Sequence, residues 1–133
     1  MANGSSTYLS QAIINAVLVT PTFPSTVTLY LALFSSDPTD DNVTANEVAG
    51  AWYARQATGG WAAPSGSANS TSNSNQIQFP AVTGSSVTVS HWGIYSALTS
   101  GNLIYSGVFT VSKTFNVGDV AVVGAAQLVI TVD

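Results

Sequence analysis

The sequence contains no cysteine, a single histidine (His91) and only two cationic side chains, Arg55 and Lys113. The lack of cysteine excludes disulfide bonds, thiolate metal sites and thiol nucleophiles. A zinc site needs about three or four protein ligands, which one histidine without cysteine does not supply. Two cations and a formal net charge of −4 in 133 residues cannot neutralise a row of phosphates. Nucleic-acid binding is therefore excluded, and we expect no metal or other cofactor.

Long apolar segments and basic targeting segments are also lacking. The longest apolar stretch, residues 121–132, is about a dozen residues long, whereas a membrane-spanning helix needs ~20. No Lys or Arg precedes Arg55, so the basic start of a secretory signal is missing. The sequence predicts a chain with no membrane segment and no targeting signal.

Charge of either sign is scarce, while apolar residues are plentiful. Charged residues make up 6% of the chain and hydrophobic residues 46%, whereas ordinary domains have ~25% charged residues. Ser, Thr, Asn and Gln must therefore supply most of the polar surface. Such a surface loses little side-chain entropy and needs little charge desolvation when another protein covers it. The composition favours dense packing between protein subunits.

One segment is typical of a helix. Apolar residues recur at helical spacing in residues 6–19, with Ser5 or Ser6 as a possible N-cap and Pro21 as the stop. From residue 25 onward the apolar pattern has a period of two. In residues 27–34 both faces are apolar, which predicts a central strand.

The rest of the chain alternates between strand patterns and turn-forming residues. Two polar segments, 37–51 and 61–76, are predicted to be exposed loops. Residues 87–95 and 102–111 form the clearest hairpin, joined through Thr99-Ser100-Gly101. The other predicted strands are 52–58, 77–79, 117–123 and 126–132. We predict a mainly β chain: one domain over residues 1–133, an antiparallel, jelly-roll-like β-sandwich with one N-terminal helix.

The candidate reactive residues are few. His91 could act as a general base, but the sequence gives it no specific nucleophile, so we interpret it as a structural or surface histidine. The acidic loop carries Asp37, Asp40, Asp41 and Glu47, and carboxylates on loops can bind calcium. Their spacing is not that of an EF-hand, and we interpret the segment as a solvated loop.

Five residues are candidates for an interface with another protein: Arg55, Trp61, Asp37, Asp40 and Glu47. Arg55 has two equal interpretations, because it could anchor an interface or pair within the chain with one of these three acids. Trp61 follows Gly59-Gly60 and is expected to be exposed. Aromatic residues could alternatively form a sugar-binding platform, although core packing is their usual role.

Several stretches, in this order, resemble a family of small phage virion proteins of the tail-fibre or capsid-decoration type. They are TVTLYLALF (26–34), DPTD (37–40), EVAG (47–50), YARQ (53–56), IQFP (77–80), VSHWGIY (89–95) and GNLIYSG (101–107), with Lys113 and Gly118-Asp119 near the end. The chain departs from the family pattern at Ser96 and in residues 61–75. The resemblance implies a part of the virion without catalytic residues.

A host-binding fibre normally needs an extended shaft built from repeats or a long coiled coil, and the sequence has neither. This argument from shape favours a capsid decoration or cement protein on the head exterior, assembled in the host cytoplasm. It would contact other copies of itself, for instance as a trimer, and phage capsid or tail proteins. The N-terminal segment, residues 37–50 and residues 61–76 are the expected contact regions. One alternative is a tail-fibre or baseplate adhesin that binds a host glycan through Trp61 and Trp92. A second alternative is a small hydrolase that uses His91 and an acidic residue.

Overall fold

The computed structural model describes residues 4–19, 28–67 and 69–132. The helical elements are α1 (Thr7–Ile14) and the π-helical turn η1 (Asn15–Val19). The strands are β1 (Gly4–Ser5), β2 (Tyr30–Phe34), β3 (Gln56–Ala57), β4 (Ser70–Ser72), β5 (Ile77–Gln78), β6 (Val87–Tyr95), β7 (Leu103–Phe115), β8 (Val122–Val123) and β9 (Val129–Thr131). The chain is mainly β with antiparallel sheets, as the sequence predicted.

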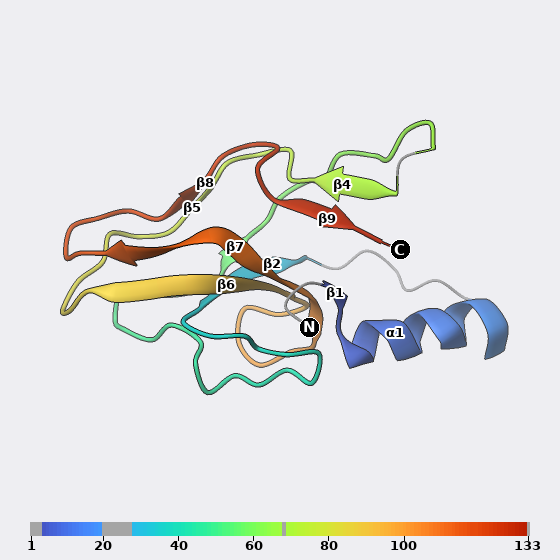
Figure 1. The fold of residues 1–133 in the computed structure, drawn as a ribbon, viewed down its shortest axis with the longest axis horizontal. Helices are drawn as coiled ribbons and strands as arrows, with labels where there is room; N and C mark the ends of the chain where they lie inside the picture. The colour runs from blue at the N-terminus through green and yellow to red at the C-terminus, as the bar shows by residue number, and fades with distance from the viewer. Residues whose placement is uncertain (1–3, 20–27, 68, 133) are drawn as a thin grey trace.

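The N-terminal helix forms where the pattern predicted it. Ser6 is the N-cap, and its hydroxyl accepts a hydrogen bond from the Leu9 N–H at 3.1 Å. Helix α1 contains no buried residue, and it extends from one end of the sheets (Figure 1). The predicted stop, Pro21, lies outside the described residues.

Strand β2 lies in the interior of a five-stranded sheet with the order β1-β7-β6-β2-β3, between β6 and β3. Leu31 and Leu33 point to one face and Ala32 and Phe34 to the other, and all four are buried. Because both faces are covered, the alternating apolar pattern runs through the strand without a polar side. The prediction of a central strand is confirmed over Tyr30–Phe34.

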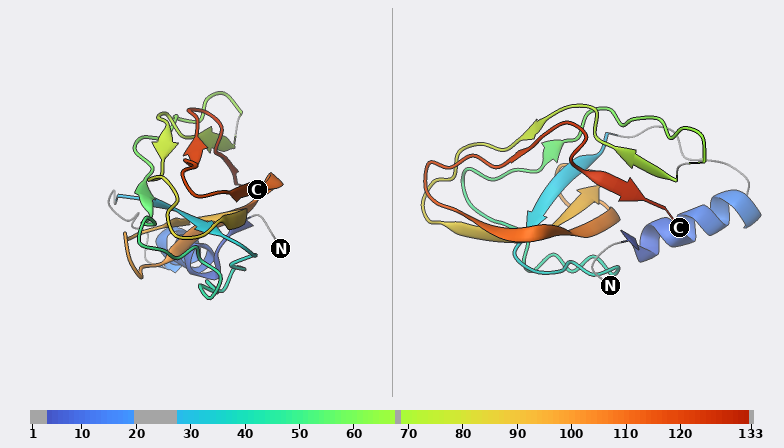
Figure 2. Two further views of the ribbon diagram at one scale, coloured as in Figure 1. Left: turned by 90° about the vertical axis from the view of Figure 1, so that its left-hand side faces the viewer. Right: turned by 45° about the horizontal axis from the view of Figure 1, so that its top comes forward.

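Two short ribbons, β4 with β9 and β5 with β8, lie across one face of this sheet (Figure 2). The larger core cluster fills the space between the layers and combines Leu33 and Trp92 of the sheet with Ile77, Phe79 and Leu128 of the second layer. This arrangement of antiparallel layers agrees with the predicted sandwich. The opposite face of the sheet carries a smaller cluster: Ala32, Phe34, Tyr95 and Leu103.

The β6–β7 hairpin is confirmed, but its ladder is irregular. Val89 pairs with Lys113 and His91 with Val108, so one residue of β6 lies opposite four residues of β7, residues 109–112. The excess length forces β7 to bulge away from its partner, as extra residues do in other antiparallel pairs. Val111 in this bulge is 76% exposed.

Four predicted segments have other bounds in the structure. The strand predicted at 52–58 is reduced to Gln56–Ala57, because Trp52 and Tyr53 turn their side chains into the core instead of alternating along a ladder. The segment 61–76 is not wholly an exposed loop, since β4 within it pairs with β9. The strands predicted at 117–123 and 126–132 are limited to Val122–Val123 and Val129–Thr131, because tight turns precede them.

Candidate functional site

Arg55 is an internal residue of the fold and is 6% exposed. Its Nε and one terminal nitrogen donate to the two carboxylate oxygens of Glu47, each at 2.8 Å. This fork-to-fork geometry is the strongest form of Arg–carboxylate pairing. Of the two interpretations left open by the sequence, the structure shows the ion pair within the chain and selects Glu47 as the partner.

The same guanidinium also holds the turn between β6 and β7. Its other terminal nitrogen donates to the carbonyl oxygens of Ala97 at 3.1 Å and Ser100 at 2.7 Å. Its central carbon lies 3.7 Å from the centroid of the Tyr95 ring, in cation–π geometry. Burial alone would lower the pKa of Arg55, but the hydrogen bonds and charge of Glu47 outweigh it and raise that pKa. Arg55 therefore stays charged and joins the acidic loop to the hairpin turn.

Two tyrosines complete this cluster. The Tyr53 hydroxyl accepts from the Leu33 N–H at 3.2 Å and donates to Glu47 at 2.9 Å. The Tyr95 hydroxyl donates to the side-chain oxygen of Asn42 at 2.6 Å. Burial raises the pKa of both phenols, that of Tyr95 to about 12. Both hydroxyls therefore remain protonated donors at neutral pH.

Stability should fall in alkaline solution because of these phenols. An unfolded tyrosine has a pKa of about 10, whereas that of folded Tyr95 is about 12. The folded state thus holds this proton more tightly, and its stabilising contribution is complete below pH ~10 and lost as the pH rises towards 12. Urea unfolding followed by circular dichroism should show the free energy of unfolding declining across this range. Compared with the unsubstituted chain, the decline should be shallower in Tyr95→Phe. It should be unchanged in Tyr8→Phe, because that substitution alters an exposed ring.

The remaining acids of the loop have structural contacts. Asp37 accepts the Thr39 N–H at 2.8 Å, which closes a local turn. The Asp40 carbonyl oxygen accepts the Thr7 N–H at 3.0 Å, and the Asp41 carboxylate accepts the Thr7 hydroxyl at 3.1 Å. Within residues 4–19, 28–67 and 69–132, no group of three or more His, Cys, Asp or Glu side chains could hold a metal ion. The contacts of Asp40 and Asp41 with Thr7 instead pack the acidic loop against the start of the helix.

The tryptophans do not form an exposed platform. Trp92 is 6% exposed and stacks on Tyr105 with ring centroids 6.5 Å apart. Trp61 was expected to be exposed, but it is half-buried against the larger core cluster and its indole nitrogen is buried. The cause is the bridge between Trp61 and Asn73, which draws the start of the polar segment onto the core.

His91 lies in β6 and is half-buried. Its Nδ1 is 2.8 Å from the Ser90 hydroxyl, which donates to the Ser35 carbonyl oxygen at 2.9 Å. The Ser35 carbonyl oxygen therefore competes with the imidazole for the single proton of the Ser90 hydroxyl, whereas in a pair of base and nucleophile the hydroxyl must donate to the imidazole.

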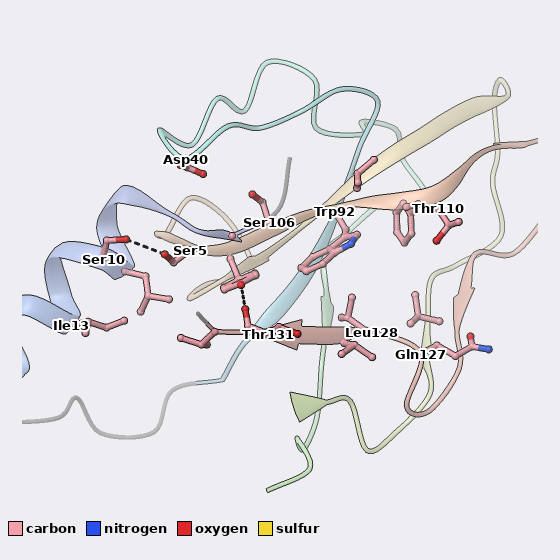
Figure 3. Close-up of a pocket in the computed structure, with 18 of the residues that line it drawn as sticks. Ser5, Ser10, Ile13, Asp40, Trp92, Ser106, Thr110, Gln127, Leu128 and Thr131 are labelled. Carbon is pink, nitrogen blue, oxygen red and sulfur yellow. Dashed lines mark hydrogen bonds between the residues drawn. The ribbon is translucent and has the colours of Figure 1, made fainter. Parts of the chain in front are cut away.

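A groove of about 1160 Å³, which was not predicted from the sequence, lies between α1, β7 and β9 (Figure 3). Ile13 of the helix, Trp92 and Leu128 are among its lining residues, and Asp40 is the only charged one. Eleven of the fifteen large hydrophobic side chains that are exposed in the described residues lie on α1 and η1 or line this groove. They are Tyr8, Ile13, Ile14, Val17, Leu18, Val19, Val108, Val111, Val122, Val129 and Val132.

The sequence indicated the apolar side chains of the helix, but not those of the groove. Apolar residues recur at helical spacing in residues 6–19, which is typical of a helix with a covered apolar face. The groove itself depends on how β7 and β9 are placed, and no local pattern records that. No helix among the described residues is long and apolar enough to cross a membrane.

A comparison with known protein families identifies the family of this chain. Residues 4–131 match the family described as "Podophage GP4 fiber I protein gp80". No curated protein sequence matches the chain. The match extends over nearly all of the 133 residues, and it agrees with the resemblance to small virion proteins noted in the sequence. The chain belongs to the podophage GP4 fiber I protein gp80 family, a family of phage virion structural proteins.

Proposed function

We propose that the chain is a structural subunit of a phage fibre, a single compact domain that acts through contacts with other virion proteins and has no catalytic centre. The observation that carries this proposal is the family match over residues 4–131, because the family's description names a fibre. The packing of the candidate residues supports it. Arg55 and Glu47 pair with each other, Trp61 packs against the core, and the Ser90 hydroxyl beside His91 also contacts the Ser35 carbonyl oxygen.

The family description favours a fibre over the capsid decoration predicted from the sequence. That preference rested on shape, since the chain has neither sequence repeats nor a coiled coil to build a shaft. A fibre can nevertheless contain compact subunits, whose copies stack or attach to an elongated chain. The apolar helix and groove supply a surface for such attachment, whereas the buried Trp92 and the half-buried Trp61 give little support to a glycan platform.

The location of the protein in purified particles tests this proposal. Antibodies raised against the chain and coupled to gold should label the fibres of intact virions in electron micrographs. Labelling spread over the head would contradict the fibre assignment and favour decoration. Absence of the chain from purified particles, measured by mass spectrometry, would overturn a structural role altogether.

A further inference from the structure

The helix is poorly supported by its own chain. None of the side chains of α1 is buried, and Leu18 and Val19 in η1 are 75% and 67% exposed. Isolated helices shorter than about 12–15 residues are marginal in water, and this one spans Thr7–Ile14 and Asn15–Val19. Its apolar surface therefore needs a cover that the described part of the chain does not provide.

The groove beside the helix offers a complementary surface. Its volume of about 1160 Å³ exceeds the ~300–1,000 Å³ of small-molecule sites. It is lined by exposed valines, including Val111, Val122 and Val129. The helix contributes Ile13 to the lining of the groove (Figure 3), whereas no residue of η1, Leu18 included, lines it. One molecule thus presents both an apolar projection, the last helical turn Asn15–Val19, and a recess, the groove beside α1.

We infer that the last turn of the helix, residues 15–19, packs into the groove of a second copy of the chain. The contact is heterologous, since the projection of one molecule meets the recess of the next, and it can be repeated around a ring or along a filament. This inference rests on the proposed function and names one partner of the fibre subunit, namely another copy of the same chain.

The chemistry of the two surfaces favours a second copy over a membrane. Residues 4–19 contain no charged side chain, and the groove contains only Asp40. Helices that bind membrane surfaces are usually rich in Lys and Arg on their polar face, and the whole chain has only two such residues. The last turn of the helix and the groove carry one charged side chain between them, Asp40, so covering one with the other desolvates little charge.

Three lysine substitutions at exposed valine and leucine positions test the inference. Leu18→Lys alters the projection, Val111→Lys alters the recess, and Val117→Lys alters a side chain that is 59% exposed and lies outside the groove. Light scattering after gel filtration should show an oligomer for the parent and for Val117→Lys. The other two variants should be monomers, with association weakened by about 100-fold or more, because each would bury an unpaired charge. Circular dichroism should show the parent's fold in all three.

A mixture of the two monomeric variants distinguishes this contact from other arrangements. The Val111→Lys chain keeps its helix and the Leu18→Lys chain keeps its groove, so together they should form a one-to-one dimer that grows no further. A mixture that stays monomeric would overturn the heterologous contact. A parent chain that is monomeric at high micromolar concentration would overturn self-association, and flotation of that monomer with phosphatidylcholine vesicles would assign the surface to a membrane instead. Either result would leave the fibre assignment intact, because gold labelling tests that assignment separately.

Discussion

Arg55→Ala is expected to lower the free energy of unfolding by about 3–5 kcal/mol, the usual cost of leaving half of a buried ion pair without its partner. The side chains of Arg55 and Glu47 are 5% and 16% exposed, so water can replace little of what is lost. The substitution also removes the donors for the Ala97 and Ser100 carbonyl oxygens. Urea unfolding monitored by tryptophan fluorescence measures the change.

Lys113→Ala is the matched control, because it removes the other cation of the chain from an exposed position. Its ammonium group lies 5.4 Å from the Phe115 ring centroid, a contact worth about 0.5–1 kcal/mol at an exposed site. Glu47→Ala and the double variant complete a thermodynamic cycle, and their costs should be clearly less than additive. Equal losses for Arg55→Ala and Lys113→Ala would contradict a stabilising role for the buried pair.

The elements that sequence reasoning predicted correctly are those with a local physical signal. Strand β2 is apolar at every position because both of its faces are covered. The β6–β7 hairpin is marked by Ser100 and Gly101, which adopt positive φ angles of 55° and 73° in the turn. Glycine reaches this conformation without steric cost. Both features can be recognised within a few residues of sequence.

The partner of Arg55 had no such signal. Asp37, Asp40 and Glu47 lie in the same loop, and composition does not distinguish them. The choice follows from tertiary structure, because Asp37 is engaged in its own turn and the Asp40 backbone contacts the helix start. The groove was missed for the same reason, since it is formed by elements more than a hundred residues apart in the chain, such as α1 and β9.

Asn73 is a buried residue of a Ser- and Asn-rich segment, and its side chain holds three backbone groups together. It lies in the polar stretch that was expected to be an exposed loop, yet it is 1% exposed. Its amide nitrogen donates to the carbonyl oxygens of Asn75 at 2.7 Å and Gly124 at 3.0 Å, and its side-chain oxygen accepts the Leu128 N–H at 2.9 Å. One side chain thus satisfies three backbone groups and joins β4 to the turn before β9.

Asn73→Ala should therefore lower the free energy of unfolding by about 3–4 kcal/mol, since each buried backbone group left without a partner costs about 1–3 kcal/mol and some will recover a bond to water. Asn69→Ala, four positions earlier in the same segment, removes one exposed hydrogen bond, from the side-chain nitrogen to the Val132 carbonyl oxygen at 2.7 Å. Its cost should be about 1 kcal/mol or less. Urea titrations of the two variants compare them directly. Similar losses for both would mean that the Asn73 side chain contributes no more than an ordinary surface contact.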